Sequence, residues 1–439
     1  ITGELENGQG PVELVYKDEN LNMQAKSQIK LDSVSPRFDF KVNMEGANLG
    51  ALEITQKDIR TGFTLDGWYE AKSNGFDAQA EIIDGVAVYN NKTYLLGGFN
   101  AKAFVREDST SVDVASRILD LNLQSNASPL AFSEAVDRHF KRYITENYQE
   151  DSITTPVNLQ INAKISQAPI LNEVFLVNLE EMDTIDIAVD FREEARKMDA
   201  NISIPYINFY SSKIDSLKIS MQSDPEDLNF NFGFNSITTG PLAIKNTSLQ
   251  GRVLNRKLNL DFSSEHEEEQ LVRVKSELNF QGDTLKFHIE PQDLILNKNP
   301  WNIADGNQLS FATEYLSFNE FRFFRNNQEM ELSNNKPGVE KDHLSLDFKN
   351  FKLAALLNFL NPEEQLATGE LNGNFVYEEP FGESGILADM SINQFKVMDV
   401  DLNTLSLKGS SSGFSTYDFD MALKGGEVDL DLTGTYTAA

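Results

Sequence analysis

One stretch of the sequence has the residue types and spacing of a catalytic nucleophile. Gly409-Ser410-Ser411-Ser412-Gly413 fits the Gly-x-Ser-x-Gly pattern of hydrolases, in which a strained turn between a strand and a helix exposes the serine. From Phe414 onward, however, the residues alternate like a further strand, so the helix that this chemistry requires is not expected. We therefore predict a hairpin turn here, no catalytic residue, and a protein that is not an enzyme.

The side chains that could bind a metal ion are scattered. The chain has four His and no Cys, and the His do not follow metal-ligand spacing: His139, His266, His288 and His343. His266 precedes three glutamates, Glu267 to Glu269, which could hold a divalent ion, but a charged loop is the simpler interpretation. We predict no metal and no cofactor.

The carboxylates are numerous and dispersed. The chain has 68 acidic and 38 basic residues, a formal net charge of -30, which repels phosphate backbones and makes nucleic acid an unsuitable partner. A glycosidase pair is conceivable, but the acids are spread over nearly every strand, where they keep edges from aggregating. Some stand in Asp-Ser/Thr triplets that resemble bacterial O-glycosylation sites, although Asp also starts turns; both alternatives stay open for Asp32, Asp108, Asp151, Asp183, Asp215 and Asp283.

The dominant pattern is an alternation of apolar and polar residues, which is typical of strands with one buried face. Short polar turns separate the runs, as at Gln281-Gly282-Asp283, so we predict sequential antiparallel strands and an all-β, elongated, repeating β-groove. The predicted groove lining consists of Phe38, Phe40, Val42, Ile185, Ile187, Val189, Phe191, Leu217, Ile219, Leu228, Phe230, Phe232, Phe234, Leu258, Leu260, Phe262, Val272, Val274, Leu278, Phe280, Leu285, Phe287, Ile289, Leu344, Leu346, Phe348, Leu430 and Leu432.

Two stretches interrupt the alternation with helical spacing. Ser128 can cap a helix that begins at Pro129 and continues to about 147, with one apolar face. A shorter helix is predicted over 351–360, ended by Pro362. We expect both helices to lie across the apolar sheet face or to plug its mouth. The predicted organisation is a groove segment over 1–146, a linker over 147–156, a second groove segment over 157–350 and a further repeat over 351–439.

The apolar face of such a sheet requires a cover, because each Å² of apolar area left in water costs about 25 cal/mol. A sandwich could bury the face. A curled trough could instead hold acyl chains, because each buried methylene contributes about 0.8 kcal/mol and a 16-carbon chain therefore more than about 10 kcal/mol.

The composition also indicates a compartment. The absence of Cys suits an oxidising compartment, and no run approaches the roughly 20 apolar residues of a membrane span. The chain begins at Ile1 without a Met or a signal-like stretch, so we interpret it as a fragment of a longer exported protein.

Several segments resemble a known family. The stretch from Leu353 to Phe375, its echo from Leu49 to Trp68, and the strands with Ile392 to Val397 and Leu405 to Leu407 are similar to the AsmA-like TamB proteins, in the style found in Bacteroidota. The resemblance implies a taco-like β-groove, anchored by an inner-membrane helix, that crosses the periplasm to an outer-membrane barrel of the TamA/BAM type. It also implies passage of phospholipid between the two membranes, with acyl chains as ligands, and support of outer-membrane protein assembly. This chain lacks the anchor helix and a clear barrel-docking domain, so we predict an internal, periplasmic segment.

Two other functions stay open. A structural stalk or adhesin-like repeat would use the same residues in closed, dry sandwich cores. A hydrolytic enzyme on a β scaffold would need carboxylates that converge in a pocket.

Overall fold

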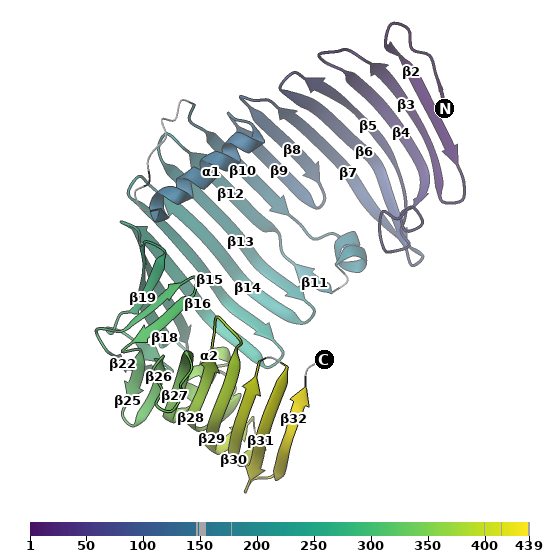
Figure 1. Cartoon of the computed structure of the whole chain (residues 1–439). Coiled ribbons are helices and arrows are strands. Elements are labelled where there is room, and N and C mark those ends of the chain that lie inside the picture. The colour runs from purple at the N-terminus through teal and green to yellow at the C-terminus, as the bar shows by residue number, and fades with distance from the viewer. Residues whose placement is uncertain (146–147, 149–154, 177, 399, 414, 438–439) are drawn as a thin grey trace. The chain divides into compact units, whose positions relative to one another are not determined.

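The computed structural model is built almost wholly from strands (Figure 1). It describes residues 1–145, 148, 155–176, 178–398, 400–413 and 415–437. Strands account for 66% of it and helices for 7%, which confirms the predicted all-β class. The chain divides into two compact units: unit 1 consists of Ile1–Arg142 and Tyr148–Leu228, and unit 2 of Tyr143–Asn147 and Asn229–Ala439.

Unit 1 is an antiparallel sheet with two helical segments. Its strands are β1 (Thr2–Gly3), β2 (Gln9–Lys17), β3 (Leu21–Lys30), β4 (Arg37–Asn48), β5 (Arg60–Lys72), β6 (Gly75–Tyr89), β7 (Lys92–Val105), β8 (Thr110–Ser116), β9 (Leu119–Ser125), β10 (Asn158–Ile165), β11 (Leu179–Met182), β12 (Ile185–Arg192), β13 (Lys197–Phe209) and β14 (Ser212–Ser223). Its helices are α1 (Pro129–Ile144), whose last two residues fall in unit 2, and the π-helical turn η1 (Leu171–Phe175).

Most strands of unit 1 pair antiparallel with the next strand along the chain, as the alternation predicted. β10 pairs with both β9 and β12, so the sheet continues past α1 and η1. Tight hairpins connect the long strands. Asn90 and Asn91, both with positive φ, form the two-residue turn between β6 and β7, and Asn tolerates this left-handed conformation better than most residues do.

Helix α1 starts where the sequence signals place it. The hydroxyl of Ser128 accepts a hydrogen bond from the Ala131 amide at 3.3 Å, and Pro129 is the first helical residue. Lys141 and Arg142 lie in its last turn, where cations are favourable.

Unit 2 contains the remaining strands and one helix. Its strands are β15 (Asp227–Thr239), whose first two residues belong to unit 1, β16 (Leu242–Leu254), β17 (Lys257–His266), β18 (Glu269–Gln281), β19 (Thr284–Ile289), β20 (Ile295–Leu296), β21 (Asn299–Pro300), β22 (Asn302–Ile303), β23 (Gln308–Ala312), β24 (Tyr315–Asn319), β25 (Arg322–Arg325), β26 (Gln328–Ser333), β27 (His343–Lys352), β28 (Ala367–Glu378), β29 (Gly385–Val397), β30 (Val400–Ser412), β31 (Thr416–Lys424) and β32 (Leu430–Thr437). Its helix is α2 (Ala354–Leu360). A nine-stranded antiparallel sheet within this unit joins β22 and β25 to β32.

Unit 2 has a packed core. Its buried side chains come from β18 to α2 and the segments between them, and they include the large rings of Trp301, Phe321 and Phe351. Helix α2 adds to this core, because the ring of Phe359 lies edge-on to that of Phe262, with centroids 5.6 Å apart.

The predicted domain boundaries are not all within the described residues. Most of the predicted linker, 147–156, lies outside them. The boundary between the two compact units falls after Leu228, within the predicted segment 157–350. The boundaries from the sequence therefore stay predictions.

Candidate functional site

One face of the unit 1 sheet carries continuous apolar rows, which we call the open face. Cross-strand pairing places the residues of this face side by side in three rows. The Phe38 row consists of Ile29, Phe38, Tyr69, Ala78, Ala103, Val112, Leu123, Ile161, Val189, Ala200 and Met221. The Phe40 row consists of Val12, Ser27, Phe40, Gly67, Ala80, Ala101, Val114, Leu121, Ala163, Ile187, Ile202 and Ile219, and the Val42 row of Leu14, Ala25, Val42, Leu65, Ile82, Phe99 and Ser116. Ile185 and Leu217 extend the same face. All nine lining residues predicted from Phe38 to Ile219 therefore come from one face of unit 1, eight of them on the open face and Phe191 in the row beside it.

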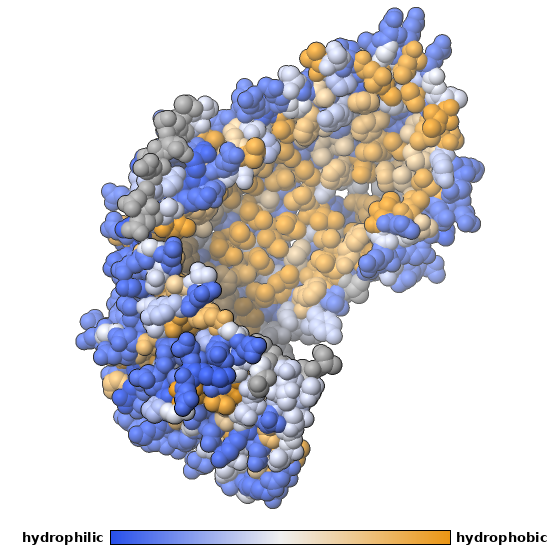
Figure 2. All heavy atoms as spheres, viewed as in Figure 1, coloured by the Kyte–Doolittle hydropathy of each residue, from blue (hydrophilic) through white to orange (hydrophobic). Residues whose placement is uncertain are grey.

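The open face is accessible to solvent. No residue of the Phe38 row or of the Val42 row is buried, although both cross the middle of long strands. In a closed sandwich, residues at such positions pack against a second layer and are excluded from water. Figure 2 shows the result as a broad hydrophobic area over the strands of unit 1, bordered by hydrophilic side chains.

The total accessible surface agrees with an uncovered face. The chain of 49.3 kDa exposes 25155 Å². Two fully separate compact proteins of about 25 kDa each would together expose only about 20,000 Å². Because surface buried between the two units would only lower the value for the whole chain, the units taken separately exceed this expectation by at least about 5,000 Å².

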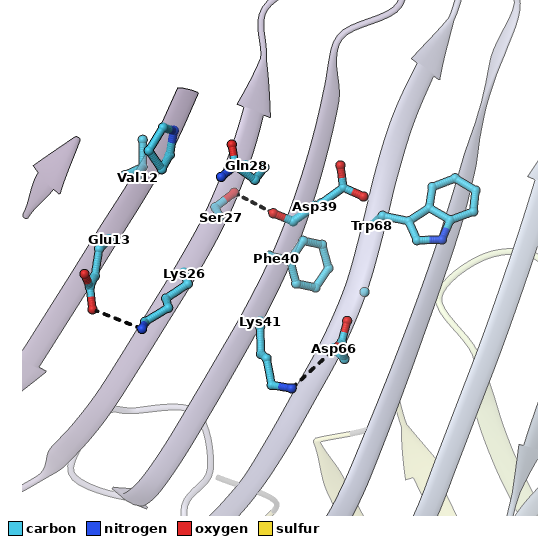
Figure 3. A pocket seen from close by; sticks show the side chains of 12 residues that line it. Val12, Glu13, Lys26, Ser27, Gln28, Asp39, Phe40, Lys41, Asp66 and Trp68 are labelled. Atoms are coloured by element: carbon cyan, nitrogen blue, oxygen red, sulfur yellow. Dashed lines mark hydrogen bonds and ion pairs between the residues drawn. The ribbon is translucent and has the colours of Figure 1, made fainter. Parts of the chain in front are cut away.

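The open face carries no charge in the described part of unit 1: its three rows contain no Asp, Glu, Lys, Arg or His. The charges lie on the opposite face. There Lys26 is 3.8 Å from Glu13, and Lys41 is 3.5 Å from Asp66, in one cross-strand row (Figure 3). Beside this row is a shallow depression of about 370 Å³, where Trp68 contributes to the lining. The guanidinium of Arg37 lies 4.6 Å from the Trp68 ring centre, so this face is a solvated, ion-paired surface.

Helix α1 covers the row next to the Phe38 row. This covered row consists of Ser125, Leu159, Phe191, Met198 and Ser223. Phe191 is 0% exposed there, because the apolar side of α1, with Phe132, Val136 and Phe140, packs on it. The expectation that this helix lies across the apolar face is confirmed.

Polar contacts of Arg138 and His139 help to fix α1 to the sheet. The Arg138 guanidinium donates to Glu193 Oε1 at 2.9 Å, and Glu193 Oε2 accepts the Val157 amide at 2.9 Å. His139 Nε2 lies 2.9 Å from the hydroxyl of Ser223. Burial, with a smaller contribution from Arg142, lowers the pKa of His139 to about 4, although Glu193 acts in the opposite direction.

The other strand ends of unit 1 are covered by the loop before β5 and by η1. Ile59, Tyr94 and Val174 are buried together there. The Tyr94 hydroxyl donates to Glu173 at 2.9 Å, and Lys92 pairs with the same carboxylate. Burial and this contact raise the pKa of Tyr94, whereas Lys92 lowers the pKa of Glu173. The open face is therefore bordered by α1 on one side and by the loop before β5 with η1 on the other, and polar contacts hold both of them in place.

In unit 2 the predicted lining divides between a core and a more accessible surface. Val272 and Ile289 are buried in the core, and other predicted lining residues pack against it: Phe262, Val274, Phe287 and Phe348. Leu258, Leu260, Leu278, Phe280 and Leu285 lie on the same face of β17 to β19, and Phe280 is 42% exposed. This face of unit 2 is thus closed in part.

The remaining predicted residues belong to β15, β27 and β32. Leu228 and Phe234 are buried, whereas Phe230 and Phe232 are half-buried, and the Phe232 and Phe234 rings are 5.9 Å apart. Leu344 and Leu346 of β27 pair with Tyr377 and Phe375. Leu430 and Leu432 of β32 pair with Leu423 and Met421, and Leu432 is exposed.

Sequence reasoning missed part of the open face. Leu65, Ile82 and Phe99 belong to the Val42 row but were not predicted. β-bulges at Gly85 and Gly97 interrupt the alternation in β6 and β7, so the period of two is lost there. The partnership of Arg138 with Glu193 left no local signal, because 55 positions separate the two residues.

The residues with catalytic or metal-binding patterns do not converge. Gly409 to Ser412 lie in β30, and the chain turns at Gly413 into β31, so the prediction of a hairpin is confirmed. Lys298 pairs with Glu269 at 2.8 Å beside His266. Within the residues that the structure describes, no group of His, Asp or Glu could hold a metal ion, and no helix is long and apolar enough to cross a membrane.

The comparisons with known proteins add no assignment. No family model, no curated protein and no solved structure matches this chain.

Proposed function

We propose that the open face binds the acyl chains of phospholipids, and that this chain is a periplasmic segment of an envelope-spanning bridge of the AsmA-like TamB type. Such a bridge carries phospholipid between the inner and outer membranes and supports outer-membrane protein assembly through a barrel of the TamA/BAM type. In this proposal, the open face contributes the lipid path, and the barrel is contacted by other parts of such a bridge.

The observation that carries the proposal is the continuity of the open face. Its rows run from β2 to β14 without a charged side chain, in a chain with a formal charge of -30. Each acyl methylene that becomes buried on such a surface contributes about 0.8 kcal/mol, so a chain of 16 carbons gains at most on the order of 10 kcal/mol, when it is fully covered. Headgroups would lie in solvent at its edges, and the face need not perform any chemistry.

The packed core of unit 2 favours a second function. Trp301, Phe321 and Phe351 are buried as in an ordinary sandwich, so unit 2 by itself fits a structural stalk. The two functions differ in whether lipid is bound, and that difference can be measured.

The experiment compares lipid bound to the wild-type chain with lipid bound to two double variants, all purified from a native envelope and analysed by lipid mass spectrometry. The test variant, Val42→Asp with Ile187→Asp, places two carboxylates on the open face. The control, Asn43→Asp with Ala188→Asp, places them on the opposite, exposed face of the same two strands. Far-UV circular dichroism verifies that both variants keep the sheet.

We expect stoichiometric phospholipid on the wild type and on the control, and its loss from the test variant. If the wild type carried no lipid, the proposed conduit would be rejected in favour of the structural stalk. Equal retention by both variants would show that the lipid binds elsewhere.

A further inference from the structure

The row beneath α1 is continuous with the open face. Met198 and Leu159, which α1 covers, belong to the same strands as Ala200 and Ile161 of the Phe38 row, two residues further along. Ala135 of α1 is 0% exposed against this row. The sheet therefore presents one apolar surface, part of which is covered by a helix of the same chain.

The helix presents side chains of the same chemistry as an acyl chain. Phe132, Val136 and Phe140 contact the sheet, whereas Glu134 and Asp137 on the other side of α1 are exposed. Exchange of these hydrocarbon contacts for acyl methylenes buries a similar apolar area, so it changes the free energy little. The polar contacts of the helix then decide which occupant is favoured.

Glu193 and Ser223, the sheet residues that contact Arg138 and His139, each retain a hydrogen-bond partner when the helix is absent. Glu193 keeps the hydrogen bond from the Val157 amide, and the Ser223 hydroxyl keeps the one from the Met198 amide at 2.9 Å. A buried polar group without a hydrogen-bond partner is costly, but neither Glu193 nor the Ser223 hydroxyl would lose all its partners. Departure of α1 also opens Glu193, which is 5% exposed beneath it, to water.

We propose that the row Ser125, Leu159, Phe191, Met198 and Ser223 is a further acyl-binding section, and that α1 covers it until an acyl chain displaces the helix. This inference rests on the proposed acyl binding by the open face. It adds a regulated section to that face, in which ligand and α1 exclude one another.

A buried thiol beneath α1 reports the displacement. The chain has no Cys, so Ala135→Cys introduces a single thiol at the helix interface. Ala87→Cys is the matched control, because Ala87 is 2% exposed but lies under the cover at the other strand ends. The rate of labelling by a small thiol reagent is measured with lysophosphatidylcholine of 16 carbons, below its micelle-forming concentration, and with glycerophosphocholine, which has the headgroup alone.

We expect lysophosphatidylcholine to accelerate labelling at Ala135→Cys at least tenfold, glycerophosphocholine to leave it unchanged, and neither to affect Ala87→Cys. Binding of lysophosphatidylcholine is followed in the same samples by equilibrium dialysis. Binding without faster labelling at Ala135→Cys overturns this inference and leaves the proposed function intact. Absence of binding overturns the proposed function as well.

A second variant tests the polar contact directly. Glu193→Gln keeps an acceptor for the Val157 amide but removes the charge that faces Arg138. Loss of a charged hydrogen bond should raise ligand-free labelling at Ala135→Cys by roughly 10-fold or more. Unchanged labelling, with a circular dichroism spectrum like that of the parent, would show that this ion pair does not retain α1.

Discussion

Acid should loosen α1 through His139. The imidazole is 5% exposed, its Nε2 lies 2.9 Å from the Ser223 hydroxyl, and its ring is edge-on to Phe191 with centroids 5.2 Å apart. Burial and Arg142 lower its pKa to about 4, against an ordinary value of about 6.5 when the helix is released. The seated helix therefore disfavours the charged imidazole. The stability of α1 on the sheet, relative to the released helix, is therefore at its full value above about pH 6.5 and declines as the pH falls toward 4. Below that pH, His139 causes no further loss.

The magnitude follows from the two pKa values. The difference of about 2.5 between the two pKa values corresponds to about 3.4 kcal/mol at most, because each pKa unit contributes about 1.36 kcal/mol. Between pH 7 and pH 5 the imidazole of the released helix becomes protonated while that of the seated helix does not, so the expected loss is about 1.8 kcal/mol, roughly a 20-fold increase in opening.

Hydrogen exchange of the α1 amides measures this opening, after correction for the intrinsic pH dependence of exchange. His139→Gln is the reference, because glutamine remains polar but does not titrate between pH 5 and 7. All other titrating groups are the same in both proteins, so the difference in pH dependence between the two proteins isolates the contribution of His139. Equal pH dependence in the wild type and in His139→Gln would refute the assigned protonation state of this residue.

Two further predictions concern the stability of the sheets and are measured by urea unfolding. Phe351→Ala should destabilise the protein by about 3 to 5 kcal/mol because Phe351 is 1% exposed in the core, whereas Phe38→Ala on the open face should cost less than about 2 kcal/mol; similar losses would mean that the open face is packed. Gly373→Ala should destabilise by roughly 1 to 3 kcal/mol or more, because Gly373 has a φ of +114° and an added Cβ would lie 2.1 Å from the Asp389 carbonyl oxygen. Gly46→Ala, with open space around it, should be tolerated, and an equal effect of the two glycine substitutions would contradict this explanation.

The alternation in the sequence predicts which side chains share a face but not what covers that face. Val42 and Val272 both stand in alternating apolar runs, yet Val42 is half-buried on the open face whereas Val272 is 6% exposed in the core of unit 2. The difference arises from segments distant in the chain, which place β25 to β28 and α2 against that core. Period-two patterning records the two sides of one strand and contains no information about a second layer.

The same limit applies to buried charge. Glu193 and Glu194 are adjacent acids that the sequence alone would place on the surface, yet Glu193 is buried because Arg138 and the Val157 amide satisfy it. By contrast, α1 was predictable from Ser128, Pro129 and its helical apolar spacing, since these signals are local. Sequence reasoning thus located the helix but not the contacts that retain it.

The open face and α1 together narrow what the occupant of unit 1 must be. Every 100 Å² of apolar surface left in water costs about 2.5 kcal/mol, so an apolar face of this extent favours any occupant that can cover it. A partner protein would ordinarily be matched by polar or charged groups at fixed positions within the interface, and the three rows of the open face offer only the hydroxyls of Ser27, Ser116 and Tyr69. Helix α1, which this chain itself supplies as a cover, places Phe132, Val136 and Phe140 over the sheet. Its polar contacts include those of Arg138 and His139. A surface without fixed polar contacts fits a hydrocarbon chain that can slide along it, which is the property that a conduit requires and a static stalk does not.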